Sequence, residues 1–322
     1  YRDLSEWSTM MMAREWDVLI VSRFYQYLVL PTRARLRWYW MHDMPAGDHR
    51  FMQTMLGSFF QTDQVMPLSQ FHQDAYIKGY REIAGIPAIA PLCWQTTNGV
   101  DLEMLRKYGT SARNPKRLIY ASRPERGLLT LLADIWPRLL KEDSGLELVI
   151  CGYNVGVERL PPEVQQIHAV ANDLLRRSKN VRVLGSLTKA KYYEVLSSCA
   201  AMAYPCIFPE INFINGLESQ GLGVPVITSD DFALKETISY EKVPGTPANI
   251  GYHAAFIEQT LKVLREPLYA RKLMRAGREW VTTHYQWKQI AESWETRMRE
   301  MFEARVKTHG RQICEGLLYD SD

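Results

Sequence analysis

Short apolar runs alternate with helical patterns along the middle of the chain, and this rhythm restricts the fold more than any other feature. The runs are RLIYAS (117–122), LELVICG (146–152), NVRVLGS (180–186), AAMAYP (200–205) and VPVITSD (224–230). Leucine and isoleucine recur at helical spacing between the first two runs, and Thr188 is placed to cap a short helix before the fourth. Strands that alternate with helices predict a parallel, doubly wound sheet, so we expect a Rossmann-type α/β domain.

A second α/β unit is expected before this sheet. Residues 17–23, 35–43 and 63–71 have the pattern of strands, and the turn signal Asn98-Gly99 marks a linker. After residue 250 the pattern is helical. A chain of 322 residues can hold two domains. We expect a partial N-terminal domain at 1–108 and a C-terminal domain at 109–285, followed at 286–322 by a helix that packs back toward the first.

Charge and cysteine content argue against several kinds of protein. The 39 Lys and Arg against 36 Asp and Glu give a net charge of +3 without a dense basic block, so nucleic acid is not an expected partner. Five scattered cysteines and histidines without metal spacing predict neither a disulfide framework nor a metal site. No apolar run reaches about 18 residues and the opening lacks the features of a secretion signal. We therefore expect a cytoplasmic protein.

One basic segment leaves a peripheral membrane contact open. In RARLRWYW (33–40), Arg33, Arg35 and Arg37 alternate with apolar residues, which is the period of a strand with one basic face. The favoured interpretation is an edge strand with solvated arginines. The alternative is a surface for an anionic lipid or acceptor.

Arginines follow the first strand of the predicted sheet. Neither G-x-G-x-x-G nor a P-loop occurs in the sequence, which disfavours a nicotinamide oxidoreductase. Open α/β sheets bind ligands outside the carboxyl ends of their strands. At one such end, YASRPERGL places Arg123 and Arg126 just before a helix, where guanidinium groups and backbone N–H groups suit phosphate. Two ordinary surface arginines are the alternative.

The segment FPEINFINGLE (208–218) follows the fourth run and carries two glutamates. Glu210 is expected in a loop and Glu218 inside the next helix, with the amides of the first helical turn between them. Carboxylates accept hydrogen bonds from hydroxyls and a helix start attracts phosphate, so a sugar attached to a diphosphate would satisfy both. Glu218 lies too deep to serve the helix dipole. In the other unit, WYWMHDM places His42 at a strand end facing the cleft, although a lone histidine is more often structural.

The combined pattern resembles the retaining glycosyltransferases of family four, which have the GT-B fold of two Rossmann-like doubly wound domains facing a cleft. The matching strings are Glu-x7-Glu followed by G-x-P-V-I-T-S, YASRPERGLLTLLADIWPRLL, the hinge NGVD and the last helix SWETRMREMF. The resemblance runs from about residue 17 to residue 305, with roughly the first half of the N-terminal, acceptor-side domain lacking a counterpart. Either a fragment or a reduced enzyme would explain that.

The resemblance implies a role for each matching residue. Glu210 would contact hydroxyls of the donor sugar, Glu218 the ribose of the nucleotide, and His42 the transferred sugar. Arg126 would meet the diphosphate, and Arg123 would substitute for an arginine that many members carry where this chain has Ala121. The remaining expected contacts are main-chain ones: the amides of Phe213 and Ile214 at the distal phosphate, and Val183 and Leu184 beside the base.

The resemblance also implies a reaction. We expect transfer of a hexose, with retained configuration, from a UDP- or GDP-sugar to a glycan, lipid or small-molecule acceptor, without a cofactor or metal. The alternative is a non-catalytic sugar-nucleotide or glycan-binding module or partner subunit. Two departures stand out: Asn212, Phe213 and Ile214 replace a common Phe-Gly-Leu, and Gly216 weakens a helix for no reason visible in the sequence.

Overall fold

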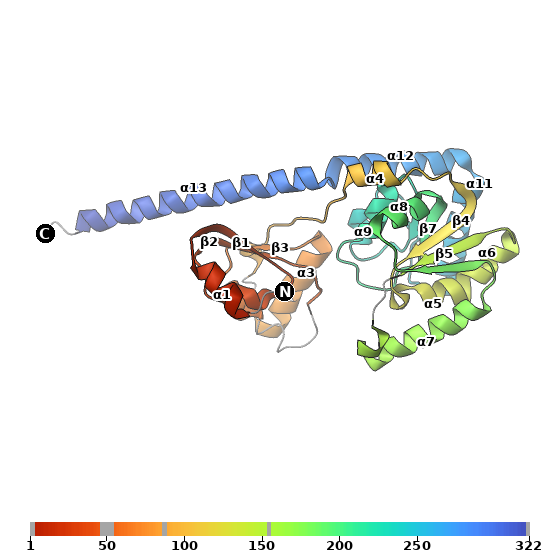
Figure 1. Cartoon of the computed structure of the whole chain (residues 1–322), viewed down its shortest axis with the longest axis horizontal. Coiled ribbons are helices and arrows are strands. Elements are labelled where there is room, and N and C mark those ends of the chain that lie inside the picture. Colours follow the sequence, from red (N-terminus) through yellow and green to blue (C-terminus); the bar gives the residue numbers. More distant parts are fainter. Residues whose placement is uncertain (1–3, 46–54, 86–88, 153–155, 320–322) are drawn as a thin grey trace. The chain divides into compact units, whose positions relative to one another are not determined.

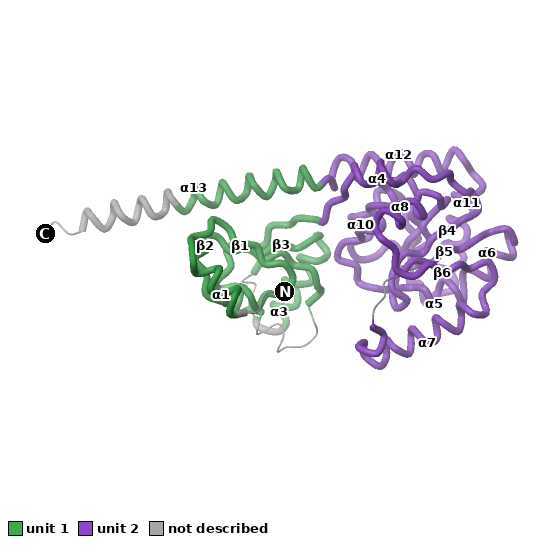
Figure 2. Tube along the Cα trace, viewed as in Figure 1, with its two compact units in different colours: residues 1–97, 287–322 green, residues 98–286 purple. Residues whose placement is uncertain are grey.

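The chain forms two compact units. The computed structural model describes residues 4–45, 55–85, 89–152 and 156–319. Unit 1 comprises Tyr1–Thr97 and Trp287–Asp322, and unit 2 comprises Asn98–Gln286 (Figure 2). The first crossing between the units falls inside the expected linker. Residues 98–108 belong to unit 2, because Leu105 is part of its core and the Val100 amide donates to the Tyr285 carbonyl oxygen at 2.6 Å.

Unit 2 contains one sheet made of the five predicted strands (Figure 1). They are β4 (Asn114–Ala121), β5 (Glu147–Cys151), β6 (Val181–Gly185), β7 (Cys199–Tyr204) and β8 (Val226–Thr228). All neighbouring strands are parallel, in the order β6-β5-β4-β7-β8. The chain therefore reverses its direction of travel across the sheet between β4 and β7, and ligands of open α/β sheets bind at this switch point.

Helices cover both faces of this sheet. Leu118 and Ile119 point to opposite faces of β4 and are both 0% exposed, as expected for a parallel sheet between two helical layers. The helices are α4 (Leu102–Tyr108), η3 (Pro124–Arg126), α5 (Leu128–Thr130), η4 (Leu131–Ile135), α6 (Trp136–Glu142), η5 (Val157–Arg159), α7 (Pro162–Arg177), α8 (Lys189–Ser197), α9 (Ile214–Gly221), α10 (Leu234–Thr237), α11 (Ile250–Arg265) and α12 (Pro267–His284). These helices form two packed groups. The first group contains α5, α6, α7 and α11, and the second contains α4, α8, α9 and α12.

The helix after β4 is not the regular one that the sequence predicts. Its middle turn, η4, is a π-helix, and α6 follows it with Pro137 as its second residue. Proline lacks an N–H and clashes with the preceding turn of a regular helix. The wider π turn accommodates Pro137 and lets the helix continue.

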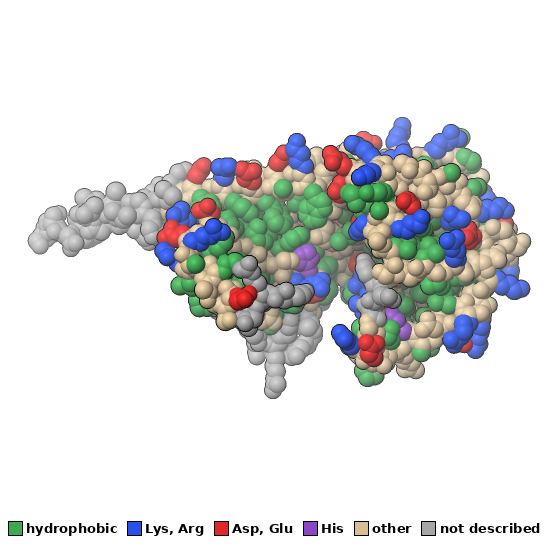
Figure 3. Space-filling model, in the orientation of Figure 1, with side chains coloured by type: hydrophobic (Ala, Val, Ile, Leu, Met, Phe, Trp, Pro, Cys, Tyr) green, Lys and Arg blue, Asp and Glu red, His purple; other side chains and the backbone are tan. Residues whose placement is uncertain are grey.

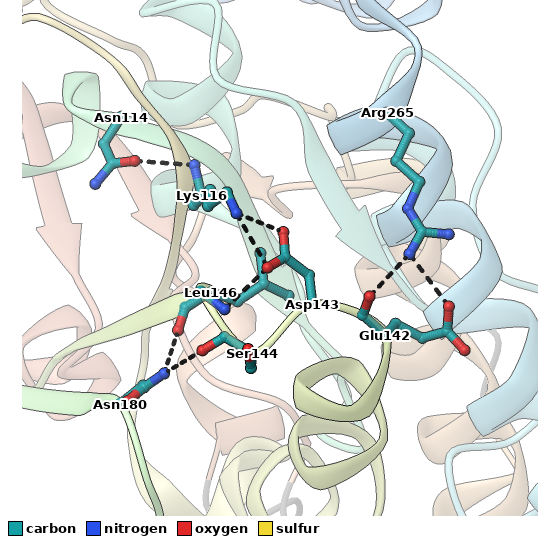
Figure 4. A network of polar contacts seen from close by, with 9 residues as sticks. Asn114, Lys116, Glu142, Asp143, Ser144, Leu146, Asn180 and Arg265 are labelled. Atoms are coloured by element: carbon teal, nitrogen blue, oxygen red, sulfur yellow. Dashed lines mark hydrogen bonds and ion pairs between the residues drawn. The ribbon is translucent and has the colours of Figure 1, made fainter.

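A polar network ties β4 to the loops that precede β5 and β6, at the edge of the sheet where β4 begins (Figure 4). Asn180 has a left-handed backbone (φ 56°), and its side-chain amide donates to the carbonyl oxygens of Ser144 and Leu146 at 2.9 and 3.0 Å. Lys116 of β4 forms an ion pair with Asp143 at 3.0 Å. These contacts fix the loops at the edge opposite to the strand carboxyl ends.

Unit 1 is built on three parallel strands in the order β1-β2-β3. The strands are β1 (Trp16–Ser22), β2 (Ala34–Trp40) and β3 (Gln64–Met66). The helices are α1 (Leu4–Met12), η1 (Tyr25–Val29), α3 (Gln70–Ala84), η2 (Ala90–Leu92) and α13 (Trp287–Tyr319). The third strand is shorter than the expected 63–71, because Pro67 cannot extend the ladder and the Ser69 side chain caps α3.

The basic strand of unit 1 is not an edge strand, so that prediction is wrong. β2 pairs with β1 on one side and with β3 on the other. Its arginines have partners within the chain: Arg33 and Arg35 lie 3.3 and 3.1 Å from the carboxylate of Glu15, and Arg37 donates to the Gln61 side chain at 2.6 Å. Intramolecular pairing thus neutralises part of the face that the sequence shows as basic.

Helix α13 packs on the strands of unit 1, and hydrophobic side chains gather beneath it in the space-filling view (Figure 3). Trp294 contacts the cluster of Leu36, Trp38 and Met66, and its indole Nε1 donates to Thr96 Oγ1 at 2.7 Å. Farther along, Arg305 forms an ion pair with Asp63 at 2.5 Å. No helix within residues 4–45, 55–85, 89–152 and 156–319 is both long and apolar enough to cross a membrane.

Trp294→Ala is expected to lower the free energy of unfolding by about 2–3 kcal/mol, because it removes the contact with Trp38 and the hydrogen bond to Thr96. Trp294→Phe should lose about 1 kcal/mol, since it keeps an aromatic ring. Urea unfolding followed by circular dichroism measures both variants, with Leu268→Ala, at a 79% exposed position, as the control. Equal stability of Trp294→Ala and the control would contradict the packing of α13.

Candidate functional site

The two loops at the switch point of unit 2 touch each other. The loop after β4 carries Arg126 and the loop after β7 carries Glu210, 84 positions away. The Ile207 amide donates to the Arg126 carbonyl oxygen at 3.3 Å. Gly127 permits this approach: its φ is 133°, and a Cβ there would lie 2.1 Å from the Pro205 carbonyl oxygen. The sheet order therefore brings the two predicted charges together.

Arg126 and Glu210 form a largely buried ion pair. Arg126 Nη1 lies 2.9 Å from Glu210 Oε1, with the side chains 26% and 6% exposed, and the guanidinium carbon lies 4.0 Å from the centre of the Phe208 ring. Burial has the largest single effect and lowers the pKa of Arg126, but the charge and hydrogen bond of Glu210, together with Tyr204 and Glu125, outweigh it, so the net direction is upward. Arg126 Nε is buried without a hydrogen-bond partner in the described part of the chain. The guanidinium thus keeps donor capacity that Glu210 does not use.

Tyr204, the last residue of β7, completes the surroundings of Glu210. Its hydroxyl donates to Glu210 Oε1 at 2.6 Å. Burial, followed by the charge of Glu210, raises the pKa of Tyr204 well above its ordinary value, so the hydroxyl stays protonated and donates. Tyr204 was not predicted as a site residue from the sequence. Its position at the carboxyl end of a predicted strand could have indicated it.

Glu218 on α9 is held in a similar way by two residues of α8. Its Oε1 accepts from the Tyr193 hydroxyl at 2.8 Å and pairs with the Lys189 ammonium group. The Glu218 side chain is only 5% exposed, and its Oε2 is buried without a hydrogen-bond partner among the described residues. A buried polar atom of this kind is unfavourable until it meets a donor. Neither Lys189 nor Tyr193 was predicted from the sequence.

A pocket of about 140 Å³ lies at the carboxyl ends of β4, β5 and β6. Its walls include Ala121, Gly152, Gly185, Lys189 and Asn215. The Asn215 side-chain amide donates to the Ala121 carbonyl oxygen and so joins α9 to the end of β4. The pocket thus borders the α8 lysine that pairs with Glu218.

The two β6 residues that were expected beside the base precede the pocket wall. Val183 is 55% exposed, while Leu184 packs against the core of unit 2. The pocket is lined instead by Gly185 and the two residues after it. The predicted position on β6 therefore lies one to two residues before the pocket.

The start of α9 explains why a glycine stands within this helix. Phe213 is buried, and its ring stacks on the Tyr204 ring at 4.4 Å between centres and 15° between planes. A Cβ on Gly216 would lie 2.2 Å from Phe213 Cδ1, so the glycine makes room for the ring. Ile214, the first residue of α9, is 39% exposed. Phe213 therefore points into the core, while α9 begins at the site.

Arg123 is already engaged with an acidic residue of its own loop. It forms an ion pair with Glu125, whose other carboxylate oxygen lies 3.3 Å from His168 Nε2 on α7. Burial has the largest single effect and raises the pKa of Glu125, but hydrogen bonds from its own backbone and from Arg123, together with the charges of Arg123 and His168, outweigh it, so the net direction is downward. The sequence did not indicate Glu125 or His168. Arg123 and Arg126 thus differ in their partners.

His42 belongs to unit 1 and follows β2 by two residues. Its ring lies 4.4 Å from the Trp40 ring, and burial, with a smaller effect of Arg23, lowers its pKa to about 4. The imidazole is therefore neutral near pH 7 and can exchange hydrogen bonds with a ligand without adding charge.

Residues of α3 fix the loop that carries His42. His72 Nε2 and the Tyr76 hydroxyl both meet the Asp43 carbonyl oxygen, at 2.9 and 3.0 Å. His72 Nδ1 accepts from the Leu68 amide at 3.2 Å, which makes Nε2 the protonated nitrogen. His72 is 0% exposed, and its burial lowers its pKa to about 4. These positioning contacts were missed because α3 and the loop are distant in sequence.

Among the described residues, no three His, Cys, Asp or Glu side chains come together in a way that could hold a metal ion. Cys93, Cys151, Cys199 and Cys206 are free thiols. The side chain of Cys314 lies outside the described residues.

Comparison with known proteins connects the chain to one family. Residues 105–280 match the family model described as "Glycosyl transferases group 1", which is more than half of the chain. The chain is also 23% identical over 156 residues to an alpha-maltose-1-phosphate synthase of Mycobacterium tuberculosis strain H37Rv. That match covers 46% of this chain and 39% of the relative, so it spans well under half of the relative's length.

Solved structures share the fold of the chain. An alpha,alpha-trehalose 6-phosphate synthase from Burkholderia multivorans has a TM-score of 0.74 at 13% identity, covering 95% of this chain and 74% of its own. HepE of Anabaena, in complex with UDP and glucose, has a TM-score of 0.70 at 14% identity, covering 92% and 80%. Sucrose-phosphate synthase from Thermosynechococcus elongatus has a TM-score of 0.68 at 16% identity, covering 90% and 74%. These likenesses confirm the predicted GT-B fold.

The free energy of unfolding is expected to fall as pH decreases from about 6.5 to about 4. His42 and His72 have folded-state pKa values of about 4, below the value near 6.5 of an unfolded chain, so the unfolded state takes up protons first. The contribution of His72 should be on the order of 3 kcal/mol above pH 6.5. Urea titrations at several pH values should show a flatter profile for His72→Asn. The exposed control His284→Asn should keep the parental slope, and an unchanged slope in His72→Asn would contradict the assignment.

Gly216→Ala is expected to destabilise the protein by about 1–3 kcal/mol, because the new methyl group collides with the Phe213 ring. Phe213→Leu in the same chain should recover part of the loss, so the two changes should not be additive. Gly251→Ala on α11 is the matched control: its Cβ would meet nothing within 4 Å, and it should be neutral or stabilising. Thermal unfolding measures the two single variants, the double variant and the control; additive losses in the double variant would rule out the collision.

Proposed function

The chain belongs to the group 1 glycosyl transferases, and we propose that it is a retaining, metal-independent hexosyltransferase that uses a UDP- or GDP-sugar as donor. The observation that carries this proposal is the buried Oε2 of Glu218, which has no hydrogen-bond partner among the described residues and lies on the helix that follows the switch-point loop. Carboxylate oxygens accept hydrogen bonds from sugar hydroxyls. A second acid, Glu210, lies in the switch-point loop beside Arg126.

The nucleotide of the donor would occupy the pocket at the ends of β4, β5 and β6. Its ribose hydroxyls would donate to Glu218 Oε2 and supply the partner that this atom lacks. The base would lie near β6, beside Gly185 and the main chain that follows Val183 and Leu184. Support comes from HepE of Anabaena, which shares the fold and is described in complex with UDP-glucose.

The diphosphate would lie between Arg126 and the start of α9. A guanidinium has five N–H donors, so Arg126 can keep its contact with Glu210 while Nε meets a phosphate oxygen. The amides of Phe213 and Ile214 would add the positive end of the helix dipole. Arg123 would contribute only if it leaves Glu125.

In the proposed reaction, Glu210 accepts hydrogen bonds from the donor sugar and His42 of unit 1 contacts the same sugar. The bond between the anomeric carbon and the phosphate oxygen breaks, and its electron pair stays on the diphosphate. The acceptor oxygen forms a new bond on the same face, and its proton passes to a phosphate oxygen. Arg126 stabilises the charge that develops on the leaving diphosphate.

The acceptor is proposed to be a glycan, a lipid or a small molecule with a free hydroxyl. A cytoplasmic location and a peripheral membrane contact remain predictions. The pairing of Arg33 and Arg35 with Glu15 gives β2 less positive charge to offer an anionic lipid than the sequence indicates.

A thermal-shift panel with UDP, GDP and their hexose conjugates should show one nucleotide series that raises the melting temperature, because a ligand of the folded state stabilises it. Glu218→Ala should weaken nucleotide binding about tenfold or more. Glu210→Ala and His42→Ala should keep binding and lose most hydrolysis of the sugar nucleotide. Glu163→Ala, an exposed glutamate of α7, is the control.

Several results of that experiment would contradict the proposal. Parental turnover in both Glu210→Ala and His42→Ala would refute their roles, and loss of turnover with EDTA would refute metal independence. Nucleotide binding without consumption of any donor, against mixed glycan, lipid and small-molecule acceptors, would favour a non-catalytic binding module.

A further inference from the structure

The two glutamates of the proposed donor site are held by the same kind of arrangement. In each, a single oxygen, Oε1, receives both a tyrosine hydroxyl and a cation. Tyr204 and Arg126 meet Glu210 Oε1, at 2.6 and 2.9 Å. Tyr193, at 2.8 Å, and Lys189 meet Glu218 Oε1. The contacts come from different elements, β7 and α8, so the repetition is not a local motif.

The tyrosines are the rigid members of each arrangement. Tyr193 is 3% exposed and Tyr204 is 1% exposed, and Tyr204 is clamped by the stacked Phe213 ring. The Lys189 side chain, in contrast, is 55% exposed at the end of a flexible stem. An exposed ammonium group can neutralise a carboxylate without defining its angle. The buried Tyr193 hydroxyl therefore sets the orientation of Glu218, whereas Tyr204 shares this role at Glu210 with the largely buried Arg126.

Occupying one oxygen has a geometric consequence for the other. The last torsion of a glutamate side chain is broad and roughly two-fold, so an unrestrained carboxylate rotates. Two donors on Oε1 remove that freedom and leave Oε2 as the acceptor for a further hydroxyl. For Glu218 this is the oxygen that is buried without a partner in the described chain. Burial raises the pKa of both Tyr193 and Tyr204, so each hydroxyl keeps the proton that it donates.

We propose that Tyr193 and Tyr204 are positioning residues that give the donor site its selectivity for hydroxyl groups. Tyr193 aims Glu218 Oε2 at the ribose of the nucleotide, and Tyr204 aims Glu210 at the hydroxyls of the transferred sugar. This inference rests on the proposed function, because it assumes a sugar nucleotide as ligand. It predicts that each tyrosine hydroxyl matters only for ligands that carry the corresponding sugar hydroxyl.

The test for Tyr193 compares ligands with and without ribose hydroxyls. Isothermal titration calorimetry measures the binding of UDP and 2′,3′-dideoxy-UDP, or of the guanine pair if GDP is the nucleotide that binds. Tyr193→Phe, which keeps the ring, should weaken binding of the normal nucleotide about tenfold. It should change binding of the dideoxy analogue less than about twofold, because Glu218 then has no hydroxyl to receive. An equal loss for both ligands, or no loss for either, would overturn the role of Tyr193.

Tyr204→Phe should show the complementary pattern. Binding of UDP alone should stay at the parental level, while kcat for hydrolysis of the UDP-hexose should fall about tenfold with a smaller change in KM. Tyr252→Phe is the matched control, since it removes a buried hydroxyl that meets Ser229 and not a carboxylate; it should leave every parameter unchanged. Weakened UDP binding in Tyr204→Phe would overturn the assignment of this tyrosine to the sugar.

The proposed function and the positioning role of the tyrosines can be refuted separately. If the parental protein binds neither UDP nor GDP, the proposed function fails, and the inference fails with it. If a nucleotide binds but the effect of Tyr193→Phe does not depend on the ribose hydroxyls, the positioning role alone is refuted. Melting temperatures measured by circular dichroism show whether each phenylalanine variant is folded before its affinities are compared.

Discussion

The parallel pairing of β4 with β7 is the constraint on which the site depends. The first strand of the sheet, β4, lies beside β7, where the strand order changes direction. The loops after Ala121 and Tyr204 therefore lie at the same edge of the sheet. Arg126 and Glu210 then meet although 84 positions separate them. A different strand order with the same local elements would separate these two loops and leave the two charges apart. At the opposite edge of the sheet, the hydrogen bond from Asn180 and the ion pair of Asp143 connect the loops before β5 and β6 to the strands (Figure 4).

Buried carboxylates are the second constraint. Removing a carboxylate from water is unfavourable unless hydrogen bonds and opposite charge compensate. In unit 2 the chain supplies that compensation twice, with a cation and a tyrosine on one oxygen of each glutamate. Glu218 Oε2 does not receive such compensation, because it is buried without a hydrogen-bond partner in the described chain. In the proposed function, a hydroxyl of the ligand would complete the hydrogen bonding of this oxygen.

Unit 1 shows how pairing within the fold changes the meaning of a sequence pattern. The arginines around β2 suggested a basic outer face, yet Glu15 lies beside them at the start of β1 and takes up two of them. The parallel register of β1 with β2 creates that contact, and no local pattern predicts it. The His42 loop is similar, because His72 and Tyr76 of α3 reach the Asp43 carbonyl oxygen from 29 and 33 positions away.

The sequence by itself determined the helices and strands of unit 2 and the charged residues that follow its strands. Strand and helix periods are properties of a few neighbouring residues, so the five strands of unit 2, the cap at Thr188 and the helices after residue 250 could all be predicted. The spacing of Glu210 and Glu218 could likewise be read directly. Tertiary structure alone decided which groups meet these residues: Tyr193, Tyr204 and Lys189 at the glutamates, and Phe213 over Gly216. Such contacts depend on strand order and on the direction of buried side chains, and neither is encoded in any short stretch of chain.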